Sequence, residues 1–279
     1  MSVLRVVHTT TFDYGGAVRA SYNEARMRPV DDEHQRARSA RVDVQPHTWA
    51  DEYVDYWGTV VTSFEMLSSH ERLTIVAESV VERGPAPPPA AACSWADIGG
   101  ESILDAQAAF LAPTATTEVP DDVGALALEA AGGLTPAAAA EAVCLAVRDR
   151  LEYVPGVTAV HTPAAEAWAA RKGVCQDMAH LAIGALRSVG IPARYVSGYL
   201  HPRGDAPIGE TVLGDSHAWL EFWTGTWTGY DPTNRRFVST DHVVVGRGRE
   251  YDDVPPLKGV YAGPGPSALE VEVQITRVG

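Results

Sequence analysis

The apolar residues of this chain change their period partway along it, and this change constrains the fold more than any other feature. From Val3 to Glu82, apolar and polar residues alternate in short runs that read VLRVVHTTTFDY, ARSARVDVQP, VDYWGTVVTSFEM and ERLTIVAESVVER. Alternation with period two is typical of strands that bury one face, and Tyr14-Gly15-Gly16 and Trp57-Gly58 supply turns between runs. Short strands at this spacing predict a β-sandwich, which we place at residues 1–83.

The next stretch is rich in proline and alanine. It begins GPAPPPAAA at Gly84, and proline can neither donate to a strand ladder nor continue one. Helical periodicity then returns over Ile103–Phe110. We therefore interpret residues 84–119 as a linker followed by a connecting helix.

Beyond residue 120 the pattern becomes helical and then returns to strands. Helical patterns cover Asp122–Ala131, Thr135–Arg150, Pro163–Arg171 and Cys175–Val189, and strand patterns cover Ala193–Tyr199, Ala218–Trp223 and Trp227–Asp231. The tail from Ala268 to Ile275 alternates strictly, so we expect a half-buried strand, preferably at an edge of the sandwich. The 279 residues thus predict an α+β protein, with a core at residues 120–279 that includes this C-terminal strand.

Charge and cysteine content exclude several classes of protein. The chain has 36 acidic and 22 basic residues, and its formal charge of -14 repels phosphate backbones and anionic lipid surfaces. No segment resembles a secretory leader or a membrane span, and the three cysteines form no paired motif. We therefore expect a cytoplasmic protein with free thiols that binds neither nucleic acid nor membranes.

Cys175 stands where a helical pattern begins, in the sequence GVCQD. A thiol at a helix N-terminus meets unpaired backbone amides and the positive end of the helix dipole, which both favour the thiolate. The alternative is a small core residue, since cysteine is among the most frequently buried residue types. Taken alone, Cys175 is compatible with either interpretation.

His217 and Asp231 lie in two strand patterns that flank Thr224-Gly225-Thr226. If these three residues form the loop of a hairpin, His217 and Asp231 share one face as diagonal neighbours. A loop of two residues would put them on opposite faces. A carboxylate beside a histidine can fix the orientation and tautomer of its ring.

Thiolate, imidazole and carboxylate are the components of nucleophilic acyl transfer. The joint pattern of Cys175, His217 and Asp231 is more specific than any of its parts. Contact between Cys175 and His217 depends on how the helix packs on the sheet, which the spacing in the sequence does not provide.

The segments GVCQDMAHLAIGALRSVGIPARYVSGYL, DSHAWLEF and GYDPTN resemble the core of the bacterial transglutaminase-like family of predicted cysteine proteases, within the papain-like superfamily. The resemblance is close over residues 153–234, and it implies a catalytic triad of Cys175, His217 and Asp231. HTTTFDY, VDYWGTVVTSFEM and ERLTIVAESVVE resemble the β-rich domain that precedes this core in the family. The expected fold is therefore a transglutaminase-like core after an N-terminal β-sandwich.

Such an enzyme must hold the oxyanion of its tetrahedral intermediate. The backbone amide of Cys175 is the natural first donor, and Gln176, Tyr153 and Trp168 are candidates for the second, although Trp168 is more typical of a core aromatic. Asp177 is a candidate to hold the catalytic residues in position through hydrogen bonds, and the alternative is that it caps the helix. We expect no metal and no organic cofactor.

The resemblance implies a cysteine-dependent acyl-transfer enzyme that acts on peptide or carboxamide bonds of a peptide or protein substrate. Water as acceptor gives a peptidase or amidase, and a lysine amine gives a protein-glutamine transglutaminase. The alternative is an inactive protein-binding module that retains the fold. An acetyltransferase or glycan amidase is a third hypothesis, for which the sequence shows no coenzyme-binding signature.

Overall fold

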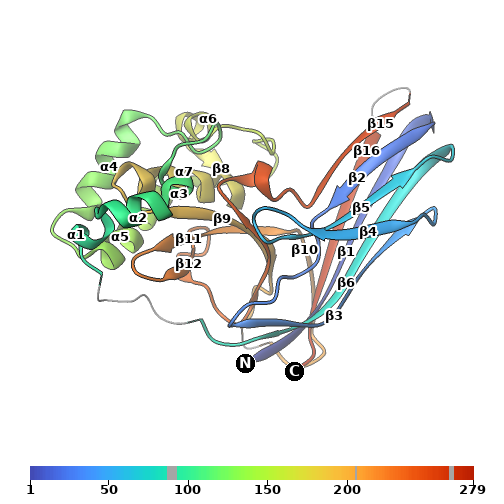
Figure 1. The fold of residues 1–279 in the computed structure, drawn as a ribbon, viewed down its shortest axis with the longest axis horizontal. Helices are drawn as coiled ribbons and strands as arrows, with labels where there is room; N and C mark the ends of the chain where they lie inside the picture. Colours follow the sequence, from blue (N-terminus) through green and yellow to red (C-terminus); the bar gives the residue numbers. More distant parts are fainter. Residues whose placement is uncertain (87–92, 205, 264–266) are drawn as a thin grey trace.

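The computed structural model describes residues 1–86, 93–204, 206–263 and 267–279. Two β-sheets lie beside a part that contains helices and a further sheet (Figure 1). In strand order, the first sheet contains β10 (Thr211–Gly214), β16 (Ser267–Arg277), β1 (Ser2–Val18), β6 (His70–Arg83) and β3 (Gln35–Gln45). The second contains β15 (Leu257–Ala262), β2 (Ala20–Ala25), β5 (Val60–Met66) and β4 (Ala50–Val54).

These two sheets form the predicted sandwich. Apolar side chains from both sheets make one buried cluster, with Phe64 and Met66 from β5 and Leu73 and Ile75 from β6. Their spacing of two residues along each strand puts them on the same face. The alternating pattern in the sequence therefore corresponds to a real interior between the sheets.

The C-terminal residues pair with the sandwich, which is where we expected the last strand, although the predicted division counted residues 120–279 with the core. β15 pairs with β2, and β16 pairs with β1 from Leu4↔Arg277 to Tyr14↔Ser267. β16 is also not an edge strand, because β10 pairs with its other side. Val273 and Ile275 of β16 are buried where the sandwich packs against the core.

In its described part, the predicted linker contains three short helices. Residues 87–92 lie outside the described part of the chain, and α1 (Trp95–Ile98), α2 (Glu101–Ala106) and α3 (Ala108–Leu111) follow. The single helix expected at Ile103–Phe110 is interrupted at Gln107, which ends α2 and precedes α3.

The core packs helices on one face of an antiparallel sheet (Figure 1). Its helices are α4 (Asp121–Ala131), α5 (Pro136–Arg148), α6 (Ala164–Ala170) and α7 (Cys175–Ser188). The sheet, in strand order, contains β13 (Arg236–Phe237), β12 (Trp227–Asp231), β11 (His217–Trp223), β9 (Ala193–Leu200) and β14 (His242–Gly248). The remaining elements are β7 (Glu152–Tyr153), which pairs in parallel with β8 (Lys172–Gly173), and the single-turn helix η1 (Tyr251–Asp253).

The helix α7 is more buried than its sequence predicts. The pattern indicated one apolar face, yet residues Gln176 to Arg187 are all buried. α7 lies between the other core helices and the sheet, and together these neighbours cover it on several sides. Within the described residues, no helix is both long and apolar enough to cross a membrane.

Polar side chains from the sandwich bind the backbone of β14. Gln35, which is buried, donates to the carbonyl of Val244 at 2.7 Å and accepts from its N–H at 2.8 Å. Arg83 is also buried, and its Nε donates to the carbonyl of His242 at 2.9 Å. The sandwich therefore fixes the position of a core strand through its main chain.

Candidate active site

Cys175 is the first residue of α7, at the mouth of two cavities. The carboxylate of Asp177 folds back and accepts the N–H of Val174 at 2.8 Å, which caps the helix start. A Cβ added to Gly173 would lie 2.7 Å from the Asp177 side chain, so only glycine permits this close approach. The local sequence thus fixes the position of Cys175, which remains partly exposed.

The hairpin of β11 and β12 has the three-residue loop. Trp223 pairs with Trp227, which leaves Thr224-Gly225-Thr226 as the connection, and Gly225 has φ +100°. This register puts His217 and Asp231 on one face, and the Nε2 atom of His217 lies 2.8 Å from Oδ2 of Asp231.

The structure also brings His217 to the thiol of Cys175, with which its side chain forms a hydrogen bond. Because Nε2 of His217 contacts Asp231, the other ring nitrogen, Nδ1, is left to face the sulfur. Burial would lower the pKa of His217, but the contacts with Asp231 and Cys175 outweigh it and raise the pKa to about 10. At neutral pH the ring is therefore an imidazolium that faces the sulfur of Cys175.

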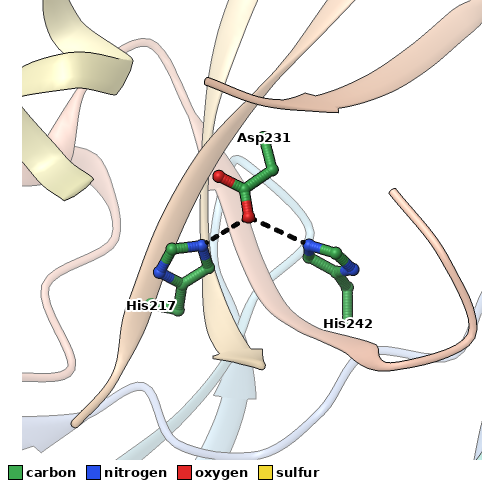
Figure 2. A group of neighbouring side chains, drawn as sticks. All are labelled: His217, Asp231 and His242. Atoms are coloured by element: carbon green, nitrogen blue, oxygen red, sulfur yellow. Dashed lines mark hydrogen bonds and ion pairs between the residues drawn. The ribbon is translucent and has the colours of Figure 1, made fainter. Parts of the chain in front are cut away.

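Asp231 accepts hydrogen bonds from several donors. His217 and His242 both direct Nε2 at Oδ2, at 2.8 and 3.2 Å (Figure 2). Asn234 adds its side-chain Nδ2 at 2.7 Å from Oδ2 and its backbone N–H at 3.1 Å from Oδ1. Burial would raise the pKa of Asp231, but the two histidines outweigh it and hold the pKa well below its usual range. The carboxylate is therefore ionised although it is fully buried.

Sequence analysis missed His242. It belongs to β14, which is separated from β12 by β11 and β9 in the sheet order, and its side chain is fully buried. No local pattern marks it, because only the tertiary structure brings it to Asp231. Asn234 lies within the GYDPTN segment, but its two donors to Asp231 were not predicted.

His217, Asp231 and His242 have possible ligand atoms within 4.8 Å of one another. The observed contacts are those of a hydrogen-bond network, since the Asn234 amide also donates to Oδ2 of Asp231. A cation here would have to displace that donor and the ring protons directed at the carboxylate. The arrangement therefore orients a histidine better than it holds a metal ion.

Two cavities, of about 310 and 180 Å³, meet at the thiol. Tyr153, Cys175, Asp215, Ser216 and His217 line both of them. The larger extends past Tyr195 and Tyr251 of the core, whereas the smaller is bounded by Leu213 of β10 and Ile275 of β16. The sandwich therefore supplies one wall of the cleft.

Two of the three side chains considered as oxyanion donors lie at the cleft. Tyr153 lines both cavities, and its pKa is raised by burial and by the nearby charges of Cys175 and Asp215, so its hydroxyl keeps its proton. Gln176 lines the larger cavity, but its Nε2 already donates to the carbonyl of Val160. Tyr153 is therefore the better candidate for the second oxyanion donor, because the Gln176 side chain already donates elsewhere.

Trp168 lies in the core and away from the cleft. Its indole N–H donates to Asp122 at 2.8 Å, the guanidinium of Arg171 lies 3.7 Å from the ring centroid, and the ring belongs to the buried core. It lines neither of the two cavities. Asp177, the remaining candidate, caps α7 and also accepts a hydrogen bond from the Thr158 hydroxyl at 2.7 Å. Asp177 therefore stabilises the start of the helix.

The other two cysteines lie in different environments. Cys144 is completely buried in α5, and burial raises the pKa of its thiol strongly. Burial and the nearby charge of Asp97 raise the pKa of Cys93. Neither thiol has a histidine partner comparable to His217 among the described contacts.

Comparisons with known proteins find matches to both parts of this chain. Residues 124–232 match the model of the transglutaminase-like superfamily, and residues 4–82 match the bacterial transglutaminase-like N-terminal region. An uncharacterised protein of Mycobacterium leprae is 44% identical over 275 residues, which cover 99% of both chains. An uncharacterised protein of Mycobacterium tuberculosis is 34% identical, over 97% of this chain and 91% of that one.

A more distant match is confined to part of the chain. A protein-glutamine gamma-glutamyltransferase of Pseudomonas aeruginosa is 32% identical over 106 residues, which are 33% of this chain and 16% of that protein. Among solved structures, a proposed cysteine protease from Cytophaga hutchinsonii superposes with a TM-score of 0.78 at 20% identity, and the match covers 100% of this chain and 92% of that one. That similarity shows a shared fold over both domains.

Proposed function

This chain belongs to the transglutaminase-like superfamily, and we propose that it is a cysteine-dependent acyl-transfer enzyme acting on peptide or carboxamide bonds. The observation that carries the proposal is the continuous set of contacts from Cys175 through His217 to Asp231 at the meeting point of two cavities. A thiol that serves only packing needs neither a charged histidine beside it nor access to a cleft.

The reaction follows from the protonation states of these groups. The Cys175 thiolate attacks the carbonyl carbon, and the oxyanion accepts hydrogen bonds from the backbone N–H of Cys175 and from Tyr153. The carbon–nitrogen bond then breaks, and the imidazolium of His217 gives its proton to the departing amine. Water or a second amine attacks the thioester, His217 accepts the proton from this nucleophile, and the thiolate is released with an acid or a new amide.

A peptide or protein is the substrate class that the cleft supports. Two cavities meet at Cys175, which leaves room for chain on both sides of the scissile bond. The partial match to a protein-glutamine gamma-glutamyltransferase favours a glutamine side chain as one acyl donor to test. The choice between water and an amine as acceptor is a second question, because both routes pass through the same thioester.

The first test is selective labelling of the thiols with iodoacetamide near pH 6. Cys175 should react much faster than Cys93 and Cys144, which serve as internal controls because burial raises the pKa of both. The variant His217→Ala should abolish the difference by removing the imidazolium. Equal labelling of all three thiols in the folded protein would favour the alternative, an inactive binding module.

The second test identifies the substrate. Incubation with peptide libraries, followed by rapid acid quenching and mass spectrometry, should detect an acyl adduct on Cys175, with Cys175→Ser as the matched control. Adding a primary amine should then yield either a new amide or only free acid. Labelling without any adduct or product would support an activated thiol but not acyl transfer to this substrate class.

A further inference from the structure

A second buried histidine contacts the carboxylate of the proposed triad. His242 begins β14, its side chain has 0% exposure, and its Nε2 lies 3.2 Å from the same Asp231 oxygen that contacts His217 (Figure 2). A buried ring at hydrogen-bond distance from a buried carboxylate needs a chemical explanation, because an unmatched polar atom there is costly.

The other ring nitrogen of His242 defines its tautomer. Its Nδ1 lies 3.2 Å from the backbone N–H of Ser239 and 3.4 Å from the Ser239 hydroxyl. A backbone N–H can only donate, so Nδ1 must accept and the ring proton must sit on Nε2. His242 is therefore a neutral imidazole that donates its single N–H to Asp231.

The electrostatic surroundings also favour the neutral ring. Burial lowers the pKa of His242, and the neighbouring charges of His217 and Arg236 act in the same direction, against the opposing effect of Asp231. The Ser239 hydroxyl donates to Asp241, and Arg83 donates to the backbone carbonyl of His242. The ring centroids of Trp219 and His242 lie 5.2 Å apart in an edge-to-face arrangement. A neutral donor at this position stabilises the carboxylate without adding a second positive charge that would lower the pKa of His217.

His242 also connects the carboxylate to the sandwich. Arg83 of β6 donates to the His242 carbonyl, and Gln35 of β3 binds both backbone groups of Val244 two residues later. These side chains are buried in the sheet that packs on β14. The main chain on which His242 stands is therefore held by a domain that contributes no member of the triad.

We propose that His242 is a positioning residue, which keeps the Asp231 carboxylate aimed at His217, and that the sandwich holds His242 in place through Arg83 and Gln35. This inference rests on the proposed function, since the orientation of Asp231 matters only if His217 transfers protons. Of the other described donors, His217 belongs to the adjacent strand of the same hairpin and Asn234 lies on the same turn as Asp231, whereas His242 connects the carboxylate to β14.

Two substitutions separate positioning from packing. His242→Phe keeps an aromatic ring against Trp219 but removes the donor, whereas His242→Gln places a neutral amide nitrogen at a similar distance from the backbone. We expect His242→Phe to lower kcat about 10- to 100-fold with little change in KM, the usual range when a partner that orients a functional histidine is lost. His242→Gln should restore much of the lost kcat.

The pH profile provides a readout that packing alone would not change. Removing one donor from Asp231 raises the pKa of its carboxyl group, so the acidic limb of the kcat profile should move to higher pH in His242→Phe and return towards the wild type in His242→Gln. The inference is wrong if both variants match the wild type in kcat and acidic limb, or if both lose the same activity in proportion to lost thermal stability.

A spectroscopic experiment keeps the test independent of turnover. In the Cys175→Ala protein, nitrogen-15 labelling of histidine should show His242 as the neutral tautomer with its proton on Nε2 at neutral pH. A protonated His242, or a proton on Nδ1, would overturn the assignment even if the enzyme proposal holds. Conversely, an unreactive Cys175 in the wild type would count against the proposed function and leave this tautomer assignment unaffected.

Discussion

The domain interface and the cleft each hold a largely buried histidine, and at neutral pH the first ring is uncharged whereas the second is positively charged. His8 of β1 lies between the sandwich and the core, where its Nδ1 contacts the Tyr199 hydroxyl at 2.9 Å and its Nε2 contacts Thr10 Oγ1 at 3.3 Å. Burial lowers the pKa of His8 to about 4, whereas the pKa of His217 is raised to about 10. The difference lies in the partners, because hydroxyl groups do not compensate a buried positive charge and a carboxylate does.

The same protein thus uses burial in two ways. At the interface, burial selects a neutral histidine that connects two sheets. In the cleft, Asp231 overcomes the effect of burial and gives a charged histidine beside a thiol. Four predictions test this comparison.

The largest expected effect is that of Asp231→Asn, which removes the charge that distinguishes the two histidines. The pKa of His217 should fall, and an amide that donates to Nε2 would favour the wrong tautomer. We expect kcat to fall by roughly 10⁴-fold, with the cysteine labelling preference near pH 6 largely lost. Steady-state kinetics and circular dichroism of the variant check this, and full activity in a folded variant would remove Asp231 from the mechanism.

The second prediction concerns alkaline pH. Because the pKa of His217 is raised to about 10, its proton and its contribution to stability are fully present below about pH 6.5 and are lost as the pH rises towards 10. Acyl transfer that needs this proton should fall about tenfold per pH unit above pH 10. Alkylation of Cys175 should persist, because the thiolate remains, so parallel loss of both reactions would contradict the assignment.

The third prediction concerns acid stability at the interface. His8 binds a proton in the unfolded chain near pH 6.5 but in the folded protein only near pH 4, so the folded state loses stability as the pH falls through this range. His8→Gln should remove part of this loss, about 2 kcal/mol between pH 7 and pH 4. Urea unfolding at both pH values measures it, and an unchanged difference between them would show that His8 is not the group responsible.

The smallest effect is expected at the wall that the sandwich contributes to the cleft. Leu213 of β10 has 72% exposure and lines the smaller cavity, so Leu213→Ala should leave stability nearly unchanged and raise KM for a peptide substrate by about two- to tenfold. Leu128→Ala is a matched control, because Leu128 has 69% exposure on α4 and lines neither cavity at the thiol. Equal KM values in both variants would exclude this wall from substrate binding.

Much of the fold was accessible from periodicity. The strands of the sandwich and the start of α7 at Cys175 follow from local patterns, because alternation and capping act over a few residues. The sequence left a two- and a three-residue loop open for the hairpin of His217 and Asp231, and the structure has the three-residue loop. The interruption at Gln107 and the pairing of β10 with β16 were missed. The first is a small break within a helical pattern, and the second joins segments far apart in the chain.

Trp168 and His242 both show that the sequence does not reveal which aromatic or histidine side chains lie at the site. Trp168 was one of three candidate oxyanion donors, with a core aromatic as the favoured alternative, and it packs in the core, whereas His242 was overlooked and contacts Asp231. Residue type alone does not separate a core aromatic from one that lines a cleft. Only distance in space does.

The sequence by itself determined the class of fold and the helix start that bears Cys175, but it left open whether a two- or three-residue loop puts His217 and Asp231 on one face. Only the tertiary structure decided that the thiol meets the imidazole, that the C-terminal strand lies inside a sheet and that His242 donates to the carboxylate. The physical reason is the separation along the chain between the residues that interact. Hydrophobic period, capping and turns are set by neighbouring residues, whereas these contacts depend on how helices and sheets pack against one another.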